Sequence, residues 1–580
     1  MMKNTLLVSL VFAVAQLFAQ KTNEDYSPAP YKTTTCRSSF EKVKLAGDVK
    51  SETIAAYLKG NLPNLKDNRT GLKLNYVKQS PGGMHYSYTQ LFQGIEVYQS
   101  EIKVNLDRSN TIYSLFDNSE NTLNWNIEIN TTGPDWRIAV DPEKGLPVLC
   151  KLKLIDNTYE ILEAGGAIIY ERDTRSFFNQ DSLVTGKVFN PDPLTTAHAV
   201  YGPPYVDNDD ATSFIMNSQM RTVTFKANFD AGVFNLESPY VRMRDIGSPF
   251  IPPATSFNGE FFFNRSQNSF EDVNAFYHIT AMQQHIHNLG FDCADALVDV
   301  DAHGFGDNDQ SYFSPSAQPQ ALYFGDGFVD DAEDADVCVH EYGHFVSETA
   351  APGSNNNGQE RKALDEGFGD YLAASYSNSL SSYRNDWVFN WDGHNVFWAG
   401  RVMNIGINYP TGSSSIYVNG QLWSAVLWCI HNTIGRAATD SLILQAHYAY
   451  AQNISLLDGA RLLMQADTLL TGGKYGCDIY RCLFLKELHP QNPFINCTVG
   501  INEQKDFPVQ FITTGEGFSL INPGSDKIHI NVLNMQGQRL KTIDESQPVF
   551  DYNDTNLASG IYLVHVRIGG VEKTFKWNKF

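Results

Sequence analysis

Two histidines spaced four residues apart constrain this chain more than any other feature. His340 and His344 flank Glu341 in the string His-Glu-Tyr-Gly-His. On an α-helix, residues four apart project from the same face, so both imidazoles can reach one tetrahedral ion while the Glu341 carboxylate lies beside it. Acidic residues precede the string and apolar residues surround it, which is typical of the first half of a buried helix. The string therefore predicts a helix that carries two zinc ligands and an adjacent proton acceptor.

A second segment contains the third ligand expected at such an ion. Residues 363–374 combine apolar positions with Glu366 and, four residues later, Asp370. A catalytic zinc site takes three protein ligands and leaves one position open, so Glu366 would complete a set of two His and one Glu. Asp370 is placed to accept the second ring N–H of a ligating histidine. The alternative is a solvated acidic face, which the apolar residues around both carboxylates disfavour.

These two motifs resemble those of the fungalysin-type relatives of thermolysin, in which an HExxH helix is followed by a helix with an E-G-x-x-D pattern. The resemblance covers most of residues 260–490: residues 270–278 are similar to the family's first helix, and residues 456–467 to its last catalytic helix. It implies an α+β fold with a two-lobed zinc peptidase domain at residues 260–500. The implied substrates are proteins or peptides.

The chemistry that this resemblance implies also follows from the residue types. Zinc lowers the pKa of its bound water and polarises the scissile carbonyl. Glu341 would take the proton from that water and later deliver it to the leaving amine. A further hydrogen-bond donor is expected to stabilise the tetrahedral oxyanion.

The expected oxyanion donor departs from the family's pattern. Relatives tend to carry a histidine before a tryptophan helix, whereas this chain has Tyr417 there. A tyrosine hydroxyl also donates hydrogen bonds, so we expect activity with an altered rate and pH dependence. His394 and His431 are alternative donors. Arg401 is a candidate to hold a substrate carbonyl, the alternative being an ordinary surface arginine.

Residues 311–327 are similar to the edge strand and turn that hold substrate in such peptidases. There the substrate adds to the sheet as a further strand through main-chain hydrogen bonds. Ser311 would contribute its backbone, and Gln310 stands where relatives tend to have asparagine. The longer Gln310 side chain leaves the substrate register open.

Acidic residues are abundant just before the HExxH string. Such clusters suit calcium, a hard cation that prefers oxygen ligands. Asp336, four residues before His340, is the first candidate calcium ligand. A role in capping the helix is the alternative.

The chain starts in the manner of an exported protein. A short basic start leads into an apolar stretch that ends at Ala19 and is too short to span a membrane, as in a signal peptide of residues 1–19. We therefore expect a secreted or cell-surface protein with no transmembrane segment. The net charge of −22, from 43 basic and 65 acidic residues, argues against a nucleic-acid partner.

Residues 20–185 alternate apolar and polar positions as half-buried strands do. Within them, residues 84–98 resemble the fungalysin/thermolysin propeptide module. The resemblance implies an inhibitory, fold-assisting pro-segment that is removed on maturation, and a permanent β-rich accessory domain is the alternative. Residues 186–259, rich in turn residues, are expected to form a β-rich lead-in to the catalytic domain.

The eight cysteines are compatible with export. Cys477, Cys482 and Cys497 lie close together in the sequence, so one disulfide is expected among them. Cys338, two residues before His340, is expected to be a thiol in the core.

Residues 501–580 form another unit with a short all-β pattern, which predicts a small sandwich. Its strand and turn pattern, with Gly560 opening an apolar strand, resembles the C-terminal sorting domain of the type IX secretion system. This implies delivery by a secretion machinery of the outer membrane. A sugar- or protein-binding β module is the alternative.

Two classes of function follow. The first is a secreted zinc endopeptidase made as a zymogen and acting as a monomer. The second is a surface-delivered adhesin or binding protein on a peptidase scaffold with weakened catalysis. The complete set of His340, Glu341, His344 and Glu366 favours the enzyme, and Tyr417 is the one feature that favours the alternative.

Overall fold

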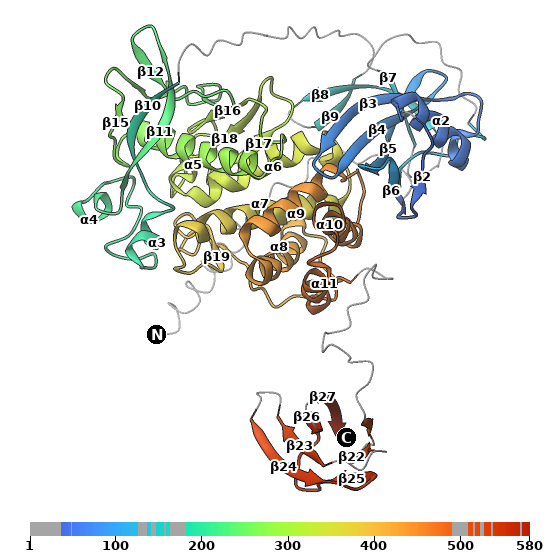
Figure 1. Cartoon of the computed structure of the whole chain (residues 1–580). Coiled ribbons are helices and arrows are strands. Elements are labelled where there is room, and N and C mark those ends of the chain that lie inside the picture. The colour runs from blue at the N-terminus through green and yellow to red at the C-terminus, as the bar shows by residue number, and fades with distance from the viewer. Residues whose placement is uncertain are drawn as a thin grey trace, which may run out of the picture. The chain divides into compact units, whose positions relative to one another are not determined.

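The computed structural model describes residues 36–47, 49–125, 136–140, 147–155, 158–162, 181–489, 509–513, 517–522, 527–534, 538–568 and 571–579. Contacts divide the chain into two compact units, Met1–Pro493 and Phe494–Phe580. The first unit mixes helices and strands (Figure 1). The expected signal peptide lies outside the described residues.

The first unit begins with a β-rich region around one long antiparallel meander. Its elements are β1 (Arg37–Ser39), β2 (Val43–Lys44), α2 (Ser51–Asn61), η1 (Pro63–Leu65), β3 (Thr70–Ser80), β4 (Gly83–Phe92), β5 (Ile95–Asp107), β6 (Thr111–Asp117), β7 (Trp136–Val140), β8 (Pro147–Ile155) and β9 (Thr158–Leu162). Alternating apolar residues of β4 and β5, such as Tyr88 and Val104, pack against Ile54 of α2, as period-two patterning requires. Gln93 and Gly94 both have positive φ between β4 and β5, the backbone of a tight hairpin turn.

Two further sheets follow. The five-stranded sheet has the order β14-β12-β11-β10-β15. Its strands are β10 (Asp181–Val188), β11 (Arg221–Asp230), β12 (Val233–Asn235), β14 (Thr255–Ser256) and β15 (Glu260–Phe261), and the short helices α3 (Pro193–Ala197) and α4 (Phe214–Asn217) lie between β10 and β11 in the sequence. Strand β10 pairs along its whole length with β11, so this sheet crosses the boundary expected at residue 185.

The four-stranded sheet has the order β13-β16-β18-β17, with β17 at its edge. Its strands are β13 (Val241–Met243), β16 (Val298–Asp301), β17 (Tyr312–Ser314) and β18 (Gln320–Tyr323). The long helix α5 (Ser269–Asn288) packs against β13 and β16. Phe313 of β17 lies edge-on to Phe345, 6.1 Å between ring centroids, so the edge strand borders the helix that carries the HExxH string.

The remaining part of the first unit is helical. It comprises η2 (Asp331–Glu333), α6 (Ala335–Ala350), η3 (Ser354–Asn356), α7 (Gln359–Leu380), α8 (Ile416–Ile434), α9 (Arg436–Tyr448), α10 (Leu456–Thr471) and α11 (Gly476–Leu485), with a two-stranded ribbon of β19 (Trp387–Val388) and β20 (Arg401–Val402). Helix α7 packs between α6 and α8. Glycines permit a close approach there: a Cβ on Gly343 of α6 would lie 3.1 Å from Gly369 Cα of α7.

One disulfide differs from the sequence-based expectation. Cys482 of α11 is bonded to Cys429 of α8, 53 residues earlier, while Cys477 is a free, exposed thiol. The prediction of one disulfide among Cys477, Cys482 and Cys497 is therefore wrong, since Cys482 pairs outside this group and Cys477 is unpaired. Proximity in the sequence misled it, because α11 packs against α8. Cys497 lies outside the described residues, and Cys338 is a buried free thiol as expected.

The described residues of the second unit form strands. One sheet has the order β21-β22-β25 and the other β24-β23-β26-β27. Their bounds are β21 (Gln510–Thr513), β22 (Gly517–Ile521), β23 (Ile528–Leu533), β24 (Arg539–Glu545), β25 (Val549–Asn553), β26 (Gly560–Ile568) and β27 (Val571–Lys579). Phe518 and Leu520 of the first sheet share one core with Val532, Val564 and Trp577 of the second.

Candidate metal centre

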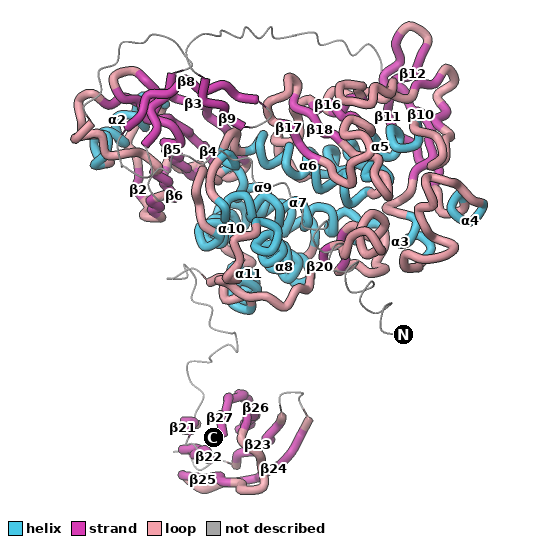
Figure 2. Tube along the Cα trace, turned by 180° about the vertical axis from the view of Figure 1, so that it is seen from behind, coloured by secondary structure: helices cyan, strands magenta, loops and turns pink. Residues whose placement is uncertain are grey.

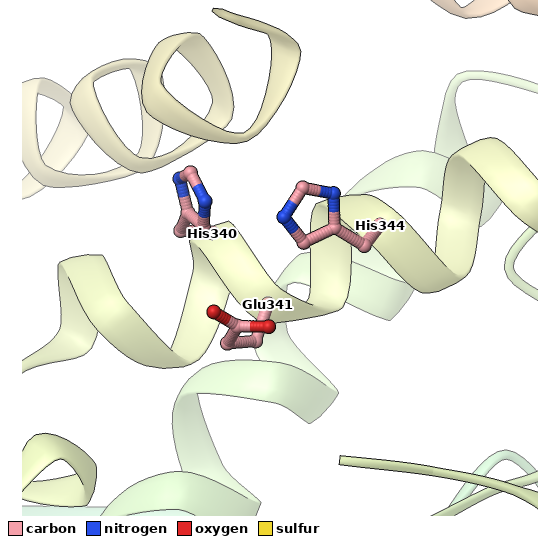
Figure 3. A group of neighbouring side chains, drawn as sticks. All are labelled: His340, Glu341 and His344. Carbon is pink, nitrogen blue, oxygen red and sulfur yellow. The ribbon is translucent and has the colours of Figure 1, made fainter. Parts of the chain in front are cut away.

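The HExxH residues lie on α6, which is a largely buried helix. Asp334 caps the helix, because its carboxylate accepts a hydrogen bond from the Asp336 backbone N–H. His340 and Glu341 are only 5% and 8% exposed. Figure 3 shows the two imidazole rings of His340 and His344 on the same side of the helix, with the Glu341 carboxylate next to them. The ligand atoms of all three residues lie within 4.8 Å of one another.

Glu366 of α7 lies opposite both histidines. Its Oε2 is 3.6 Å from His340 Nε2, and its Oε1 is 3.8 Å from His344 Nε2. Ligand atoms at 2.0–2.1 Å from a tetrahedral zinc are roughly 3.4 Å apart, so small movements suffice to close this set on one ion. Glu366 Oε2 and Glu341 Oε2 are buried without a hydrogen-bond partner. Buried orphan oxygens beside two imidazoles fit a bound cation.

A carboxylate stands behind each histidine. Asp365 Oδ2 is hydrogen-bonded to His344 Nδ1 at 2.6 Å, and Asp370 Oδ1 lies 3.1 Å from His340 Nδ1 without the geometry of a hydrogen bond. A hydrogen bond such as that between His344 and Asp365 fixes the tautomer that leaves Nε2 free for a metal. Asp365 was missed by the sequence argument. Its signal is weak, since it is one more acidic residue next to Glu366.

The carboxylates dominate the electrostatics of the centre. Burial alone would lower the pKa of each histidine, but Asp370 and Glu366 raise the pKa of His340, and Asp365 and Glu366 raise the pKa of His344 to about 10. Burial likewise opposes ionisation of Glu366, yet the two imidazoles lower its pKa to about 2. The field that holds protons on the imidazoles would equally hold a divalent cation, which competes with those protons.

Glu341 has a different environment from Glu366. Burial raises the pKa of Glu341, and the nearby His344 and His340 offset this only in part. A carboxylate whose pKa is shifted toward neutrality is suited to accept and return a proton. Glu341 and Glu366 can therefore serve different roles, one in proton transfer and one as a ligand.

Arg401 and Tyr417 lie together beside this centre. Arg401 Nη1 is 2.5 Å from Asp370 Oδ1 and 3.5 Å from Glu366 Oε2. Its guanidinium carbon lies 5.0 Å from the centroid of the Tyr417 ring. Arg401 is thus tied to the carboxylates around the histidines and is no ordinary surface arginine.

The chain carries a fungalysin/thermolysin propeptide motif. A family model with the description Fungalysin/Thermolysin Propeptide Motif matches residues 75–119, which run from within β3 to just beyond β6. The match supports a fungalysin/thermolysin-like peptidase, a family of zinc metalloproteases that are secreted with propeptides. No curated protein matches the chain at a significant level. Among the described residues, no helix has both the length and the apolar character that crossing a membrane requires.

His394 and His431 are engaged elsewhere. His394 Nε2 lies 3.0 Å from the Arg401 carbonyl oxygen, and its ring stacks on Trp387. His431 lies 3.3 Å from the Tyr371 hydroxyl and stacks on Trp428. These contacts give both histidines structural partners, so the geometry favours neither as the oxyanion donor.

Gln310 and Ser311 directly precede the edge strand β17. Gln310 is exposed, and the Ser311 hydroxyl donates a hydrogen bond to Asp331 Oδ2. The side chain of Ser311 is thereby used within the protein. What remains available along this edge is the backbone, which is the group that substrate addition to a strand requires.

Asp336 has protein partners for both carboxylate oxygens. Oδ1 accepts a hydrogen bond from the Ser377 hydroxyl, and Oδ2 accepts one from the Phe389 backbone N–H at 2.8 Å. Asp334, and not Asp336, is the residue that caps α6. This geometry does not favour a calcium ion at Asp336.

Proposed function

We propose that the protein is a secreted zinc endopeptidase made as a zymogen. His340, His344 and Glu366 would hold the zinc ion, and Glu341 would act as general base and then general acid. The observation that carries the proposal is the convergence of two imidazoles and a carboxylate from two packed helices, with a buried proton acceptor beside them.

Zinc held by this set would polarise a peptide carbonyl and lower the pKa of a water molecule. Glu341 would take a proton from the attacking water and pass it to the leaving amine. Asp370 and Asp365 would keep the two histidines in their ligating tautomers. Tyr417 is the residue that we assign to oxyanion stabilisation, because it lies beside Arg401 next to the centre.

Contacts of the β-rich region with the helices support the zymogen assignment. Strand β3 packs against α9 (Figure 2). Gln445 of α9 accepts a hydrogen bond from the Gly82 backbone N–H at 2.8 Å and donates one to Ser80 Oγ at 2.9 Å. The Asn105 side chain donates to the Ala449 carbonyl oxygen at 3.1 Å. These bonds are buried, and in a zymogen they would hold the proposed pro-segment of residues 20–185 against α9 until cleavage.

The ends of the chain complete the proposal. Residues 1–19 would direct export, and residues 501–580 would act as a type IX sorting domain recognised by a secretion machinery of the outer membrane. The mature peptidase would comprise the lead-in at residues 186–259 and the catalytic domain at residues 260–500, and would act as a monomer on protein substrates.

The substitution Glu341→Gln tests the mechanism. It removes the proton acceptor and keeps the shape of the side chain, so casein hydrolysis by the processed protein should fall by about 10²- to 10⁴-fold with zinc content unchanged. Glu348→Gln makes the same change on the same helix, where Glu348 accepts a hydrogen bond from Gly353 N, and should cleave at the wild-type rate. An undiminished rate in Glu341→Gln would remove Glu341 from the mechanism.

The alternative function is a binding protein on a weakened peptidase scaffold. The presence of Tyr417 in place of the family's histidine favours it. Mass determination and zinc analysis of the processed protein distinguish the two: one bound zinc, a removed pro-segment and no chelator-sensitive cleavage would favour binding, whereas chelator-sensitive cleavage establishes the peptidase.

A further inference from the structure

Three buried carboxylates gather between α5 and the segment that leads into α6. Glu271 lies in the first turn of α5, and Asp330 and Glu333 lie at the start and end of the η2 segment. Their exposed fractions are 1%, 5% and 0%, and one oxygen of each lies within 4.8 Å of the others. Such proximity of three carboxylates in the interior requires compensation.

Among the residues that the structure describes, one buried cation, Arg265, forms ion pairs at this group. Arg265 Nη2 lies 2.9 Å from Glu333 Oε2, 2.5 Å from Asp207 Oδ1 and 3.3 Å from Asp210 Oδ1, so a single guanidinium serves three carboxylates. In the described part of the chain, no Lys, Arg or His lies within ion-pair distance of Glu271 or Asp330. Glu271 and Asp330 therefore form no ion pair among these residues, and the charge of Arg265 acts on Asp330 only from a greater distance.

Two oxygens of the group are also without hydrogen bonds. Glu271 Oε2 and Asp330 Oδ1 are buried and have no partner. Oxygens that surround one cation at 2.3–2.6 Å lie up to roughly 5 Å apart, and one oxygen of each of the three carboxylates lies within 4.8 Å of the others.

We propose that Glu271, Asp330 and Glu333 bind one divalent cation of the calcium class. All the donor atoms in this group are oxygens. Hard cations such as calcium prefer oxygen ligands, whereas zinc usually takes nitrogen and sulfur ligands. Burial, reinforced by Glu333, raises the pKa of Asp330 to about 10, which shows how poorly the site accommodates its negative charges alone. The ion would join the first turn of α5 to η2 and so fix the entry into the HExxH helix.

A second acidic group provides the matched control. Asp309, Asp331 and Asp392 also have oxygens within 4.8 Å of one another, but Asp309 is not buried. Because Asp330 and Asp331 are adjacent and belong to different groups, calcium uptake alone does not assign the ion. The variants Glu271→Gln and Asp309→Asn each remove one charge from one group and do so without loss of side-chain volume.

The test uses the full-length protein after treatment with a calcium-selective chelator. Calcium uptake is measured by calorimetry, and terbium is used as a luminescent substitute. Trp391 Nε1 donates a hydrogen bond to Glu333 Oε2 at 2.9 Å, so terbium bound there should emit on tryptophan excitation. We expect wild type and Asp309→Asn to bind calcium alike, and Glu271→Gln to lose at least tenfold in affinity together with most of the terbium emission.

Three outcomes would overturn the assignment. These are an absence of calcium uptake and sensitised emission in the wild type, unchanged uptake in Glu271→Gln, and loss of uptake in Asp309→Asn alone. Should Glu271→Gln fail to fold, Asp330→Asn removes another ligand of the same group and is read in the same way.

Discussion

The substitution Gly369→Ala tests whether the packing of α6 on α7 positions the proposed zinc ligands. A Cβ at this position would lie 2.7 Å from His340 Nδ1 and 2.8 Å from its Cε1. Ordinary contacts of this kind begin at 3.4 Å. The imidazole would therefore have to move by about 0.7 Å, or the two helices would have to separate.

The magnitude follows from the tolerance of a metal site. Zinc–ligand distances are held to about 0.2 Å, so a displacement several times larger cannot leave His340 in place. Changes just outside a ligand set typically lower metal affinity by about 10- to 100-fold, and we expect a loss in this range, about 1.4–2.7 kcal/mol. Overpacking costs about 1–3 kcal/mol of stability, which the better helix propensity of alanine offsets by about 1 kcal/mol.

Zinc affinity is measured by competition with a chromophoric chelator, alongside thermal unfolding. Gly459→Ala is the matched control, because its Cβ would meet Leu364 Cδ2 at 2.6 Å, the far end of a flexible side chain in the same helical core. We expect that variant to keep wild-type zinc affinity. If Gly369→Ala also keeps it while remaining folded, His340 is not held by this packing as a ligand, and the reasoning fails.

Two further predictions concern stability. Replacing Cys429 and Cys482 by serine opens a 53-residue loop and should lower the free energy of unfolding by about 4 kcal/mol; an unchanged urea midpoint relative to the oxidised wild type would contradict this. Burial lowers the pKa of His85 to about 3, whereas in the unfolded chain it is about 6.5. As the pH falls below 6.5 only the unfolded chain takes up this proton, so the folded state should lose about 2 kcal/mol between pH 6.5 and 4.5 through this residue. His85→Gln, which can still bond to Ser80 and Asn105, should narrow its stability difference from wild type by that amount between those pH values, and a constant difference would refute the assignment.

The sequence predicted which side chains of the candidate metal centre point the same way, because the spacing of residues along a helix determines the direction of their side chains. Residues four apart share a helix face, so His340 and His344 had to point together, and so did Glu366 and Asp370. The sequence did not predict how α6 and α7 pack against each other. The close approach depends on Gly343 and the residues around it meeting across α6 and α7, which is a property of tertiary packing that no local pattern encodes.

The features that the sequence did not reveal are those formed between distant segments. Asp365 was missed because its partner is 21 residues earlier, and the partner of Cys482 was missed because α8 and α11 are distant in the sequence. The buried pairing of Arg265 with Glu333 spans 68 residues. Acidic residues near the HExxH string suggested calcium. Only the structure shows that both carboxylate oxygens of Asp336 accept hydrogen bonds from the protein, whereas Glu271 Oε2 has no hydrogen-bond partner.

Arg401 gives the replacement of histidine by Tyr417 a physical meaning. Its guanidinium contacts Asp370 and Glu366 and lies against the Tyr417 ring. An arginine stays charged at all physiological pH values, so a protonated histidine at position 417 would face a permanent positive charge. A tyrosine there remains a neutral donor across the range in which a histidine would titrate. If Tyr417 does stabilise the oxyanion, the neighbourhood of Arg401 makes tyrosine the more compatible residue, and the pH dependence of the peptidase then arises from Glu341 and the metal centre instead of from this position.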